Sequence, residues 1–481
     1  MGLETMMYEM LWSGVFPVLA TASEVNVEID TGPMVLAGVL LSLVVIYLAS
    51  KLGGEISRKV DLPPVLGELV GGVVVGVSVL HLLVFPEGGA TASDSLIMSV
   101  LQQLGQLSPQ ALESVYATQG EVLSVLAELG VIILLFEIGL ESDLRELQKV
   151  GYQAAVVAVV GVAAPFAAGT LGLMYFFGTP AIPAIFAGAA LTATSIGITS
   201  KVLAELGRLK TREGQMIVGA AVIDDVLGII VLAVVASLAK TGEVDILNVV
   251  YLIISATTFL LGSVLLGKFF NKSFVAIADK LQTRGNLVIP AFTFAFFMAF
   301  LANIIQLEAI LGAFAAGLVL DETDKRKELD KQVMPIADIL VPIFFVSVGA
   351  QADLRVLNPF VAENRAGLVI SVFLLVVAIA GKLVTGWMVF DKKPVNRFAI
   401  GVGMIPRGEV GLVFAGIGAA SGVLSKPLEA AIIIMVILTT FLAPPFLRVA
   451  FKGSPEESLD SSEIMEDLPA NTSNTVTQAK S

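Results

Sequence analysis

Apolar residues occur along this chain in repeated runs of about 20, and short segments that hold most of the charged residues separate these runs. A helix of that length can cross the hydrocarbon core of a bilayer, so the pattern predicts an all-α polytopic membrane protein with about thirteen transmembrane helices. The predicted spans are 33–52, 62–85, 121–141, 152–178, 182–205, 215–240, 247–270, 286–305, 306–320, 335–351, 366–390, 396–421 and 428–450.

Segments of different composition flank the membrane domain, which we place at 33–452. Residues 1–32 are moderately apolar but lack the basic start of a signal peptide, so we expect an interfacial segment outside the cytoplasm. Residues 453–481 are acidic and rich in Ser, Thr and Asn, which predicts a disordered cytoplasmic tail. The outer loop 86–120 has no Lys or Arg and holds two short amphipathic segments, SLIMSVLQQLGQL and QALESVYA.

The distribution of Lys and Arg predicts the orientation in the membrane. When alternate loops are assigned to opposite sides, 21 basic residues fall on one side and 4 on the other. Because cytoplasmic loops carry the excess of positive charge, we expect the N-terminus outside and the C-terminus in the cytoplasm. Only Lys382 and Arg407 lie well inside predicted spans, so both are candidates for a functional site.

Two adjacent carboxylates, Asp224 and Asp225, lie inside the apolar run Ala220–Val235. One Asp at the centre of a membrane helix costs about 2.5 to 3.5 kcal/mol on insertion scales, so two in succession require a partner, water or a cation. Neighbours on a helix point about 100° apart, so one Asp can face a protein partner while the other faces a cavity. The pair predicts an ion or proton site, with a purely structural ion pair as the alternative.

Composition excludes several kinds of chemistry. The 481 residues are 56% hydrophobic and 15% charged, and they include no Cys and one His. Disulfides, thiolate chemistry and His-rich or Cys-based metal centres are therefore excluded. The spans contain no arrangement of nucleophile and base and no nucleotide-binding motif. We therefore expect a transporter and not an enzyme, without a cofactor and without a nucleic-acid partner.

Two pieces of the chain match each other when the sequence is shifted by 210 positions. Glu128–Leu147 lies over Asp338–Leu357, with Gly139 on Gly349, and both pieces continue with the triplet Asp-Leu-Arg. The shared triplet argues against the alternative, which is chance similarity between short apolar helices.

A second match precedes the first in each half, because VLGELVGG at 65–72 resembles ILGAFAAG at 310–317. The loop assignment makes the matched helices run in opposite directions through the membrane. We therefore predict inverted-topology repeats, the first at about 62–240 and the second at about 306–450, as in many secondary transporters.

One helix in each repeat is interrupted in the middle of its span, at LTATSIGITS (191–200) and at GMIPRGEVGL (403–412). Hydroxyl side chains weaken the first helix, whereas Pro406 and Gly408 break the hydrogen-bond ladder of the second. Discontinuous helices in corresponding positions of two halves point to a transport site. The polar residues at these breaks are Thr192, Thr194, Ser195, Arg407 and Glu409.

Several ordered motifs resemble the monovalent cation:proton antiporter-2 family, and within it the bacterial sodium/proton antiporters of the electrogenic type with two aspartates. The motifs are LPPVLGELVGG, LLFEIGLE, TATSIGITSKVLAELG, VIDDVLG, ILGAFAAGLVL, PIFFVSVGA and MIPRGEVGLVFA, and the likeness covers residues 33–450. The resemblance implies a homodimer with a dimerisation domain and a core domain. In that core, two discontinuous helices cross and carry the ion.

The resemblance also implies roles for individual residues. The second Asp, here Asp225, is the ion and proton carrier, and the first, Asp224, pairs with Lys382. Arg407 and Glu409 match an intramembrane Arg-Gly-Glu element of the family. The potassium-linked branch carries a nucleotide-binding domain after the membrane region, which this sequence does not contain. Na+ is therefore the expected cation, with Li+ as a further one.

The residues also suggest how exchange would work. Hard cations prefer oxygen ligands, which Asp225 and Thr194 could supply to Na+. A proton competes for the same carboxylate, and competition gives antiport if the empty anionic form cannot reorient. If Lys382 loses its proton when Na+ binds, two protons exchange for each Na+. The alternative for Lys382 is a structural counter-ion. We expect Arg407 and Glu409 to neutralise each other and the ends of the broken helices.

Other functions remain open at this point. K+/H+ exchange is the second candidate, and a cation channel or a ligand-sensing receptor is a third. The membrane is expected to be bacterial, either the plasma membrane or an internal one such as a thylakoid. Glu308, at the start of an apolar helix, is expected to cap that helix near the outer surface.

Overall fold

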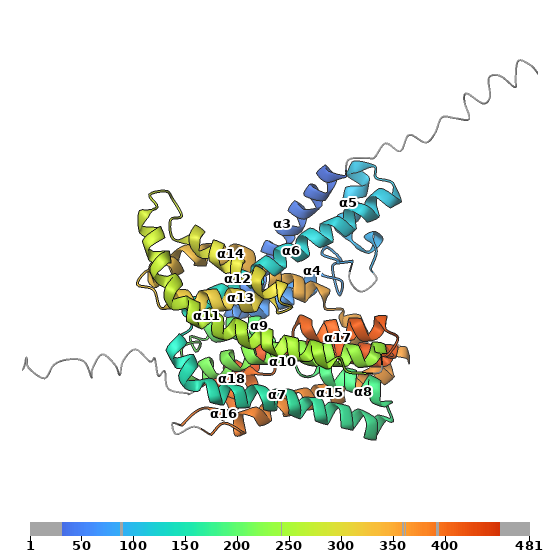
Figure 1. The fold of residues 1–481 in the computed structure, drawn as a ribbon. Helices are drawn as coiled ribbons and strands as arrows, with labels where there is room; N and C mark the ends of the chain where they lie inside the picture. Colours follow the sequence, from blue (N-terminus) through green and yellow to red (C-terminus); the bar gives the residue numbers. More distant parts are fainter. Residues whose placement is uncertain are drawn as a thin grey trace, which may run out of the picture.

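The computed structural model describes residues 31–86, 90–241, 243–357, 360, 362–390 and 394–452, so the predictions for 1–30 and 453–481 lie outside the described residues. All regular structure in the described residues is helical (Figure 1), which confirms the all-α prediction. The helices are α3 (Gly32–Lys59), α4 (Pro64–Val75), η1 (Ala92–Asp94), α5 (Leu96–Gly105), α6 (Pro109–Glu141), α7 (Leu144–Phe177), α8 (Ala181–Ala190), α9 (Ile196–Glu205), α10 (Arg212–Thr241), α11 (Ile246–Lys280), α12 (Val288–Ile304), α13 (Ala309–Asp321), α14 (Arg326–Gln351), η2 (Leu354–Leu357), α15 (Ala362–Trp387), α16 (Arg397–Gly403), α17 (Glu409–Ala420) and α18 (Lys426–Phe451).

Every predicted span falls on one helix or on two short helices separated by a break. Eight of the described helices are long and apolar enough to cross a membrane, namely α3, α6, α7, α10, α11, α14, α15 and α18. The other spans fall on the shorter helices α4, α12 and α13 and on the broken pairs α8/α9 and α16/α17. The count of thirteen crossings therefore stays a prediction.

Two details of the sequence prediction are wrong. Helix α4 ends at Val75 and not near residue 85, because Gly76 adopts an extended backbone and the chain then folds back to hydrogen-bond with the Val75 carbonyl. The segment QALESVYA is the first part of α6 and not a separate amphipathic element. Ser108 begins that helix by accepting a hydrogen bond from Ala111 N at 3.2 Å, and Pro109 takes the first helical position.

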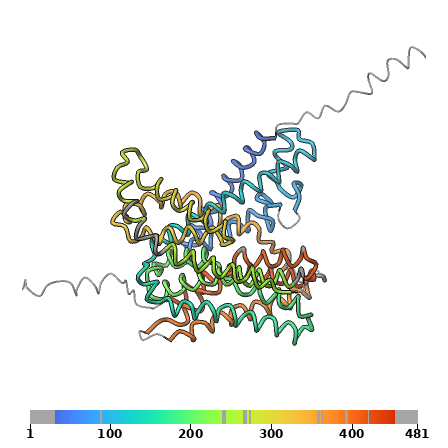
Figure 2. Tube along the Cα trace, viewed as in Figure 1, coloured from blue at the N-terminus to red at the C-terminus, as the bar shows by residue number. Residues whose placement is uncertain are grey.

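The helices form two groups, which lie one above the other in Figures 1 and 2. The first group contains α3, α4, α5, α6, α11, α12, α13 and α14, and the second contains α7, α8, α9, α10, α15, α16, α17 and α18. At the boundary, α9 contacts α4 and α6, and α10 contacts α11. The broken helices belong to the second group, so a site at their breaks can face the first group.

Glycines make two equivalent helix crossings within the first group. Where α4 crosses α14, a Cβ added to Gly72 would lie 2.9 Å from the Gly349 Cα. Where α13 crosses α6, a Cβ added to Gly317 would lie 2.9 Å from the Gly139 Cα. The predicted repeat pairs Gly72 with Gly317 and Gly349 with Gly139, so a two-fold axis would generate one crossing from the other. The inverted repeat itself stays a prediction.

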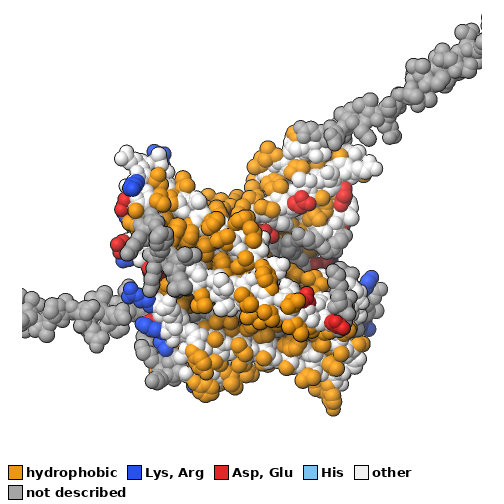
Figure 3. All heavy atoms as spheres, in the orientation of Figure 1, with side chains coloured by type: hydrophobic (Ala, Val, Ile, Leu, Met, Phe, Trp, Pro, Cys, Tyr) orange, Lys and Arg blue, Asp and Glu red, His pale blue; other side chains and the backbone are white. Residues whose placement is uncertain are grey.

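The surface in Figure 3 is covered by hydrophobic side chains over its middle, and Lys and Arg gather mainly at the left end of the view. A band of exposed apolar side chains is what a helix bundle presents to lipid. The orientation in the membrane stays a prediction from the loops.

Candidate ion-binding site

The two broken helices of the second group cross at residues 191–195 and 404–408. Pro406 has no N–H to continue a helix, and Gly408 adopts an extended conformation before α17 begins. Gly408 also permits close approach, because an added Cβ would lie 2.9 Å from the Ser195 Oγ. The predicted crossing of two discontinuous helices is therefore present.

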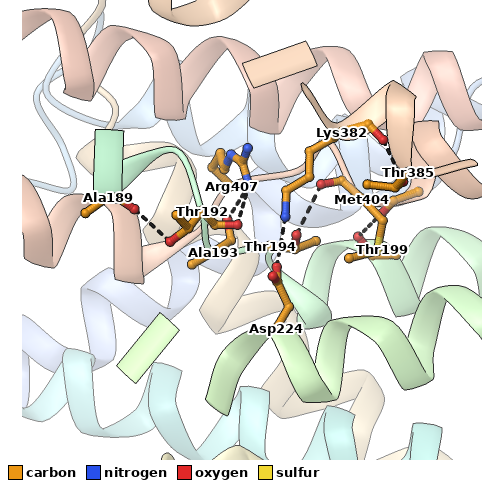
Figure 4. Close-up of polar contacts among 11 residues, drawn as sticks. Ala189, Thr192, Ala193, Thr194, Thr199, Asp224, Lys382, Thr385, Met404 and Arg407 are labelled. Atoms are coloured by element: carbon orange, nitrogen blue, oxygen red, sulfur yellow. Dashed lines mark hydrogen bonds and ion pairs between the residues drawn. The ribbon is translucent and has the colours of Figure 1, made fainter. Parts of the chain in front are cut away.

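Hydrogen bonds fasten the two breaks to each other. The backbone N–H of Ser195 donates to the Pro406 carbonyl at 2.8 Å. The Thr194 hydroxyl donates to the Met404 carbonyl at 3.2 Å (Figure 4). These bonds satisfy polar groups that the interrupted helices leave free in an apolar environment. They also fix the position of both segments around the centre of the second group.

Arg407 is fully buried and lies against the end of the first broken helix. Its Nη1 donates to the carbonyls of Thr192 at 3.0 Å and Ala193 at 2.6 Å (Figure 4). Because the carboxyl end of a helix carries partial negative charge, the guanidinium neutralises the end of α8. Its Nε and Nη2 have no hydrogen-bond partner among the described side chains. The Glu409 side chain is not one of these, so its pairing with Arg407 stays a prediction.

Lys382 on α15 and Asp224 on α10 form a buried ion pair (Figure 4). The Lys382 Nζ lies 3.0 Å from the Asp224 Oδ2, and both side chains are 0% exposed. Gly161 on α7 leaves room for the ammonium, because an added Cβ there would lie 3.2 Å from Nζ. This contact between Asp224 and Lys382 is the one that the family resemblance implies.

Asp225 faces a different environment from its neighbour. It is 3% exposed and lines a small cavity between the two helix groups. The volume in which the centre of a water molecule can lie is about 10 Å³, so the cavity can hold one water molecule. Thr194, Ser195 and Gly408 line the cavity from the breaks, and Glu308 lines it from the first group. A cation in this cavity would meet the Asp225 carboxylate and oxygen atoms of the first break.

Of two further residues named in the sequence analysis, Glu308 lines this cavity and Thr192 does not. The Thr192 hydroxyl donates to the Ala189 carbonyl at 2.7 Å, near the end of α8. The expectation that Glu308 caps its helix is wrong in the described structure. Glu308 is the N-cap residue of α13, but its side chain makes no capping hydrogen bond and lines the cavity instead.

One polar contact of the crossing was not predicted. The Thr199 hydroxyl donates to the Gly403 carbonyl at 3.0 Å and joins α9 to the end of α16 (Figure 4). A signal was present, because Thr199 lies four positions after Ser195 and therefore on the same face of the helix that follows the break.

Comparison with known proteins identifies the family. Residues 35–452 match the family described as sodium/hydrogen exchanger, transmembrane. The chain belongs to this family. The match spans both broken helices, both aspartates and Lys382, so the site described above lies inside the exchanger domain.

This exchanger is 62% identical to the high-affinity Na+/H+ antiporter NhaS3 of Synechocystis sp. over 443 residues, which are 92% of this chain and 96% of the relative. It is 32% identical to the Na+/H+-K+ antiporter GerN of Bacillus cereus, over 88% of this chain and 98% of the relative. The solved structure of the sodium proton antiporter MjNhaP1 from Methanocaldococcus jannaschii matches with a TM-score of 0.57. That match covers 87% of this chain and 97% of the other at 17% identity, which shows a shared fold.

Proposed function

We propose that this exchanger is a secondary active Na+/H+ antiporter in which Na+ and a proton compete for the Asp225 carboxylate. The observation that carries the proposal is the different environment of the two aspartates. Lys382 neutralises Asp224, whereas Asp225 lines a cavity large enough for a single small ligand. A buried carboxylate in a membrane favours a nearby cation or a proton, and a cation in this cavity would lie beside Asp225.

The atoms around Asp225 suit Na+. The Thr194 hydroxyl donates a hydrogen bond to the Met404 carbonyl, which leaves the lone pairs of Oγ1 available to a cation. The carbonyls of Thr192 and Ala193 already accept hydrogen bonds from Arg407. We therefore assign the Asp225 carboxylate and the Thr194 hydroxyl as the first ligands of Na+.

Coupling follows from the charge of the site. Either Na+ or a proton neutralises Asp225, and a neutral site can pass through the closed intermediate of alternating access with a small desolvation cost. The empty anionic site cannot do so, and each crossing therefore carries one of the two ligands. If Lys382 also releases a proton when Na+ binds, two protons exchange for one Na+ and the cycle moves charge.

The test is the variant Asp225→Asn in proteoliposomes that report internal pH. We expect addition of Na+ to release no protons, because the amide cannot exchange Na+ for a proton. The matched control is Asp279→Asn, which removes a carboxylate on α11 that is half exposed and pairs with Lys325. The control should retain wild-type exchange. Exchange by a folded Asp225→Asn protein would contradict the assignment of the carrier.

K+/H+ exchange is the second candidate, because the relative GerN is described as exchanging both Na+ and K+. Parallel assays with Na+, Li+ and K+ distinguish the cations. A channel would produce currents far above carrier turnover, whereas an exchanger reverses at a potential fixed by both gradients.

The assembly and location belong to the same proposal. The exchanger is a homodimer in a bacterial bilayer, either the plasma membrane or a thylakoid, with its N-terminus outside and its C-terminus in the cytoplasm. The excess of Lys and Arg on one side supports this orientation. The resemblance to the antiporter family supports the dimer.

A further inference from the structure

A second and larger cavity, of about 390 Å³, adjoins the cavity that contains Asp225. The two share four lining residues of the first group, Val131, Glu308, Ile310 and Phe344. Exposed Glu128 and Gln351 also line the larger cavity, so it reaches the surface of the protein. It lies on the side predicted to be outside the cytoplasm, where α13 begins and α14 ends.

The wall of the larger cavity is mainly apolar, and its charged side chains are all acidic. Its oxygen-bearing side chains are Ser124, Glu128, Asn303, Glu308, Ser347 and Gln351. None of the residues that line it in the described structure is Lys or Arg. Two carboxylates in a concave wall with low-dielectric surroundings raise the local concentration of cations.

Ser347 gives an independent indication that the cavity holds a polar ligand. Its side chain is 3% exposed, and its Oγ has no hydrogen-bond partner among the described residues. A buried hydroxyl without a partner is unfavourable, and buried polar groups are usually satisfied by protein, water or a ligand. A hydrated cation in the cavity would supply that partner.

Contacts also join the two helix groups at the opposite end of the molecule. The Glu205 carboxylate on α9 accepts a hydrogen bond from Val65 N at the start of α4, at 3.2 Å. Arg448 on α18 forms an ion pair with Asp61, which lies between α3 and α4. Each contact joins the second group to the first on the side predicted to be cytoplasmic. The lining that the two cavities share connects Asp225 with the Glu308 side.

We propose that Glu308 and Ser347 form a waiting site, where hydrated Na+ binds before it moves to Asp225. This inference rests on the proposed function. Glu308 suits the role because it lines both cavities and its charge at the N-terminus of α13 is stabilised by the helix dipole. It belongs to the first helix group, whereas Asp225 belongs to the second. A shift of one group against the other would separate the two carboxylates, so Glu308 acts only on cations that arrive from its own side.

The test uses membrane vesicles of known sidedness from bacteria without other Na+/H+ antiporters. In right-side-out vesicles, Glu308→Gln should raise the apparent KM for Na+ by about fivefold and leave kcat nearly unchanged, because one charge is lost near the cation's route. In everted vesicles the KM should not change. The effect should shrink when choline chloride is raised to about 0.3 M, because salt screens the lost charge.

Three further variants separate charge from shape. Glu308→Asp keeps the charge and should retain a KM close to that of the wild type. Ser347→Ala should raise the KM by about twofold, because one neutral ligand is lost. Glu121→Gln, on an exposed position of α6 that does not line the cavity, is the matched control and should change nothing.

The outcomes are distinguishable. An unchanged KM for both Glu308→Gln and Ser347→Ala would overturn the waiting site, as would a fall in kcat alone in both vesicle types. An effect confined to everted vesicles would contradict the placement of the waiting site on the outer side. If the wild type shows no exchange, or Asp225→Asn retains it, the proposed function fails, and this inference fails with it.

Discussion

At the scale of single residues, we expect the buried pair Asp224–Lys382 to affect stability as well as transport. Both side chains are fully buried, so removing one leaves the other charge without compensation. We expect Lys382→Gln to destabilise the protein by about 3 to 5 kcal/mol. The double variant Asp224→Asn/Lys382→Gln should recover most of that loss. Thermal unfolding in detergent measures both, and a double variant as unstable as the single one would show that the pair is not the cause.

The sequence predicted part of this site for physical reasons. Adjacent positions on a helix cannot point the same way, so two neighbouring aspartates had to face different surroundings. Spacing did not show which of them meets Lys382, because that contact joins α10 to α15 across the fold. The family resemblance suggested Asp224, and the ion pair agrees with it. The position of Glu308 beside a cavity depends on tertiary packing, which the sequence does not show. From its place at the start of α13, the sequence indicates only a helix cap.

At the scale of helices, the glycine crossings of the first group are sensitive to side-chain size. Gly317 on α13 packs against Phe136 and Gly139 of α6. Gly317→Val should lower the free energy of unfolding by about 1 to 3 kcal/mol, because the backbones must move apart. Gly262→Val on α11 is the control, since an added Cβ there meets nothing within 4 Å. Equal effects of the two variants, measured by thermal unfolding, would contradict this account of the crossing.

Elements were predicted well where an apolar run alone defines them, as for α7, α10 and α18. Boundaries failed where a single residue decides them. Gly76 ends α4 inside a run that remains apolar, and the pair Ser108–Pro109 starts α6 inside a segment that looks separate. The two breaks were predicted because Pro406 and Gly408, and the hydroxyls of 192–195, interrupt apolar helices with chemistry that is visible in the sequence.

At the scale of the whole molecule, the site lies between two helix groups that the sequence did not place against each other. The predicted repeat indicated which helices correspond, but not that Asp225 of the second group faces Glu308 of the first. That boundary depends on long-range contacts, such as those of α9 with α4 and α6. Movement at this boundary would change access to Asp225 and leave the ion pair intact, since Asp224 and Lys382 lie within one group.

The charge carried by a whole transport cycle tests the role of Lys382. If Na+ binding displaces one proton from Asp225 and one from Lys382, each cycle moves two protons against one Na+ and transfers one net charge. With equal pH and Na+ on both sides, an inside-negative potential should then drive Na+ out of proteoliposomes until the gradient reaches about tenfold per 60 mV. Sodium flux under a potential set with valinomycin measures this, once exchange with K+ has been assayed.

The double variant Asp224→Asn/Lys382→Gln should still exchange Na+ for a proton down a pH gradient, because Asp225 remains. It should not respond to voltage alone, because one proton and one Na+ carry equal charge. If Na+ does not move with voltage in the wild type, Lys382 keeps its proton and serves only as a counter-ion.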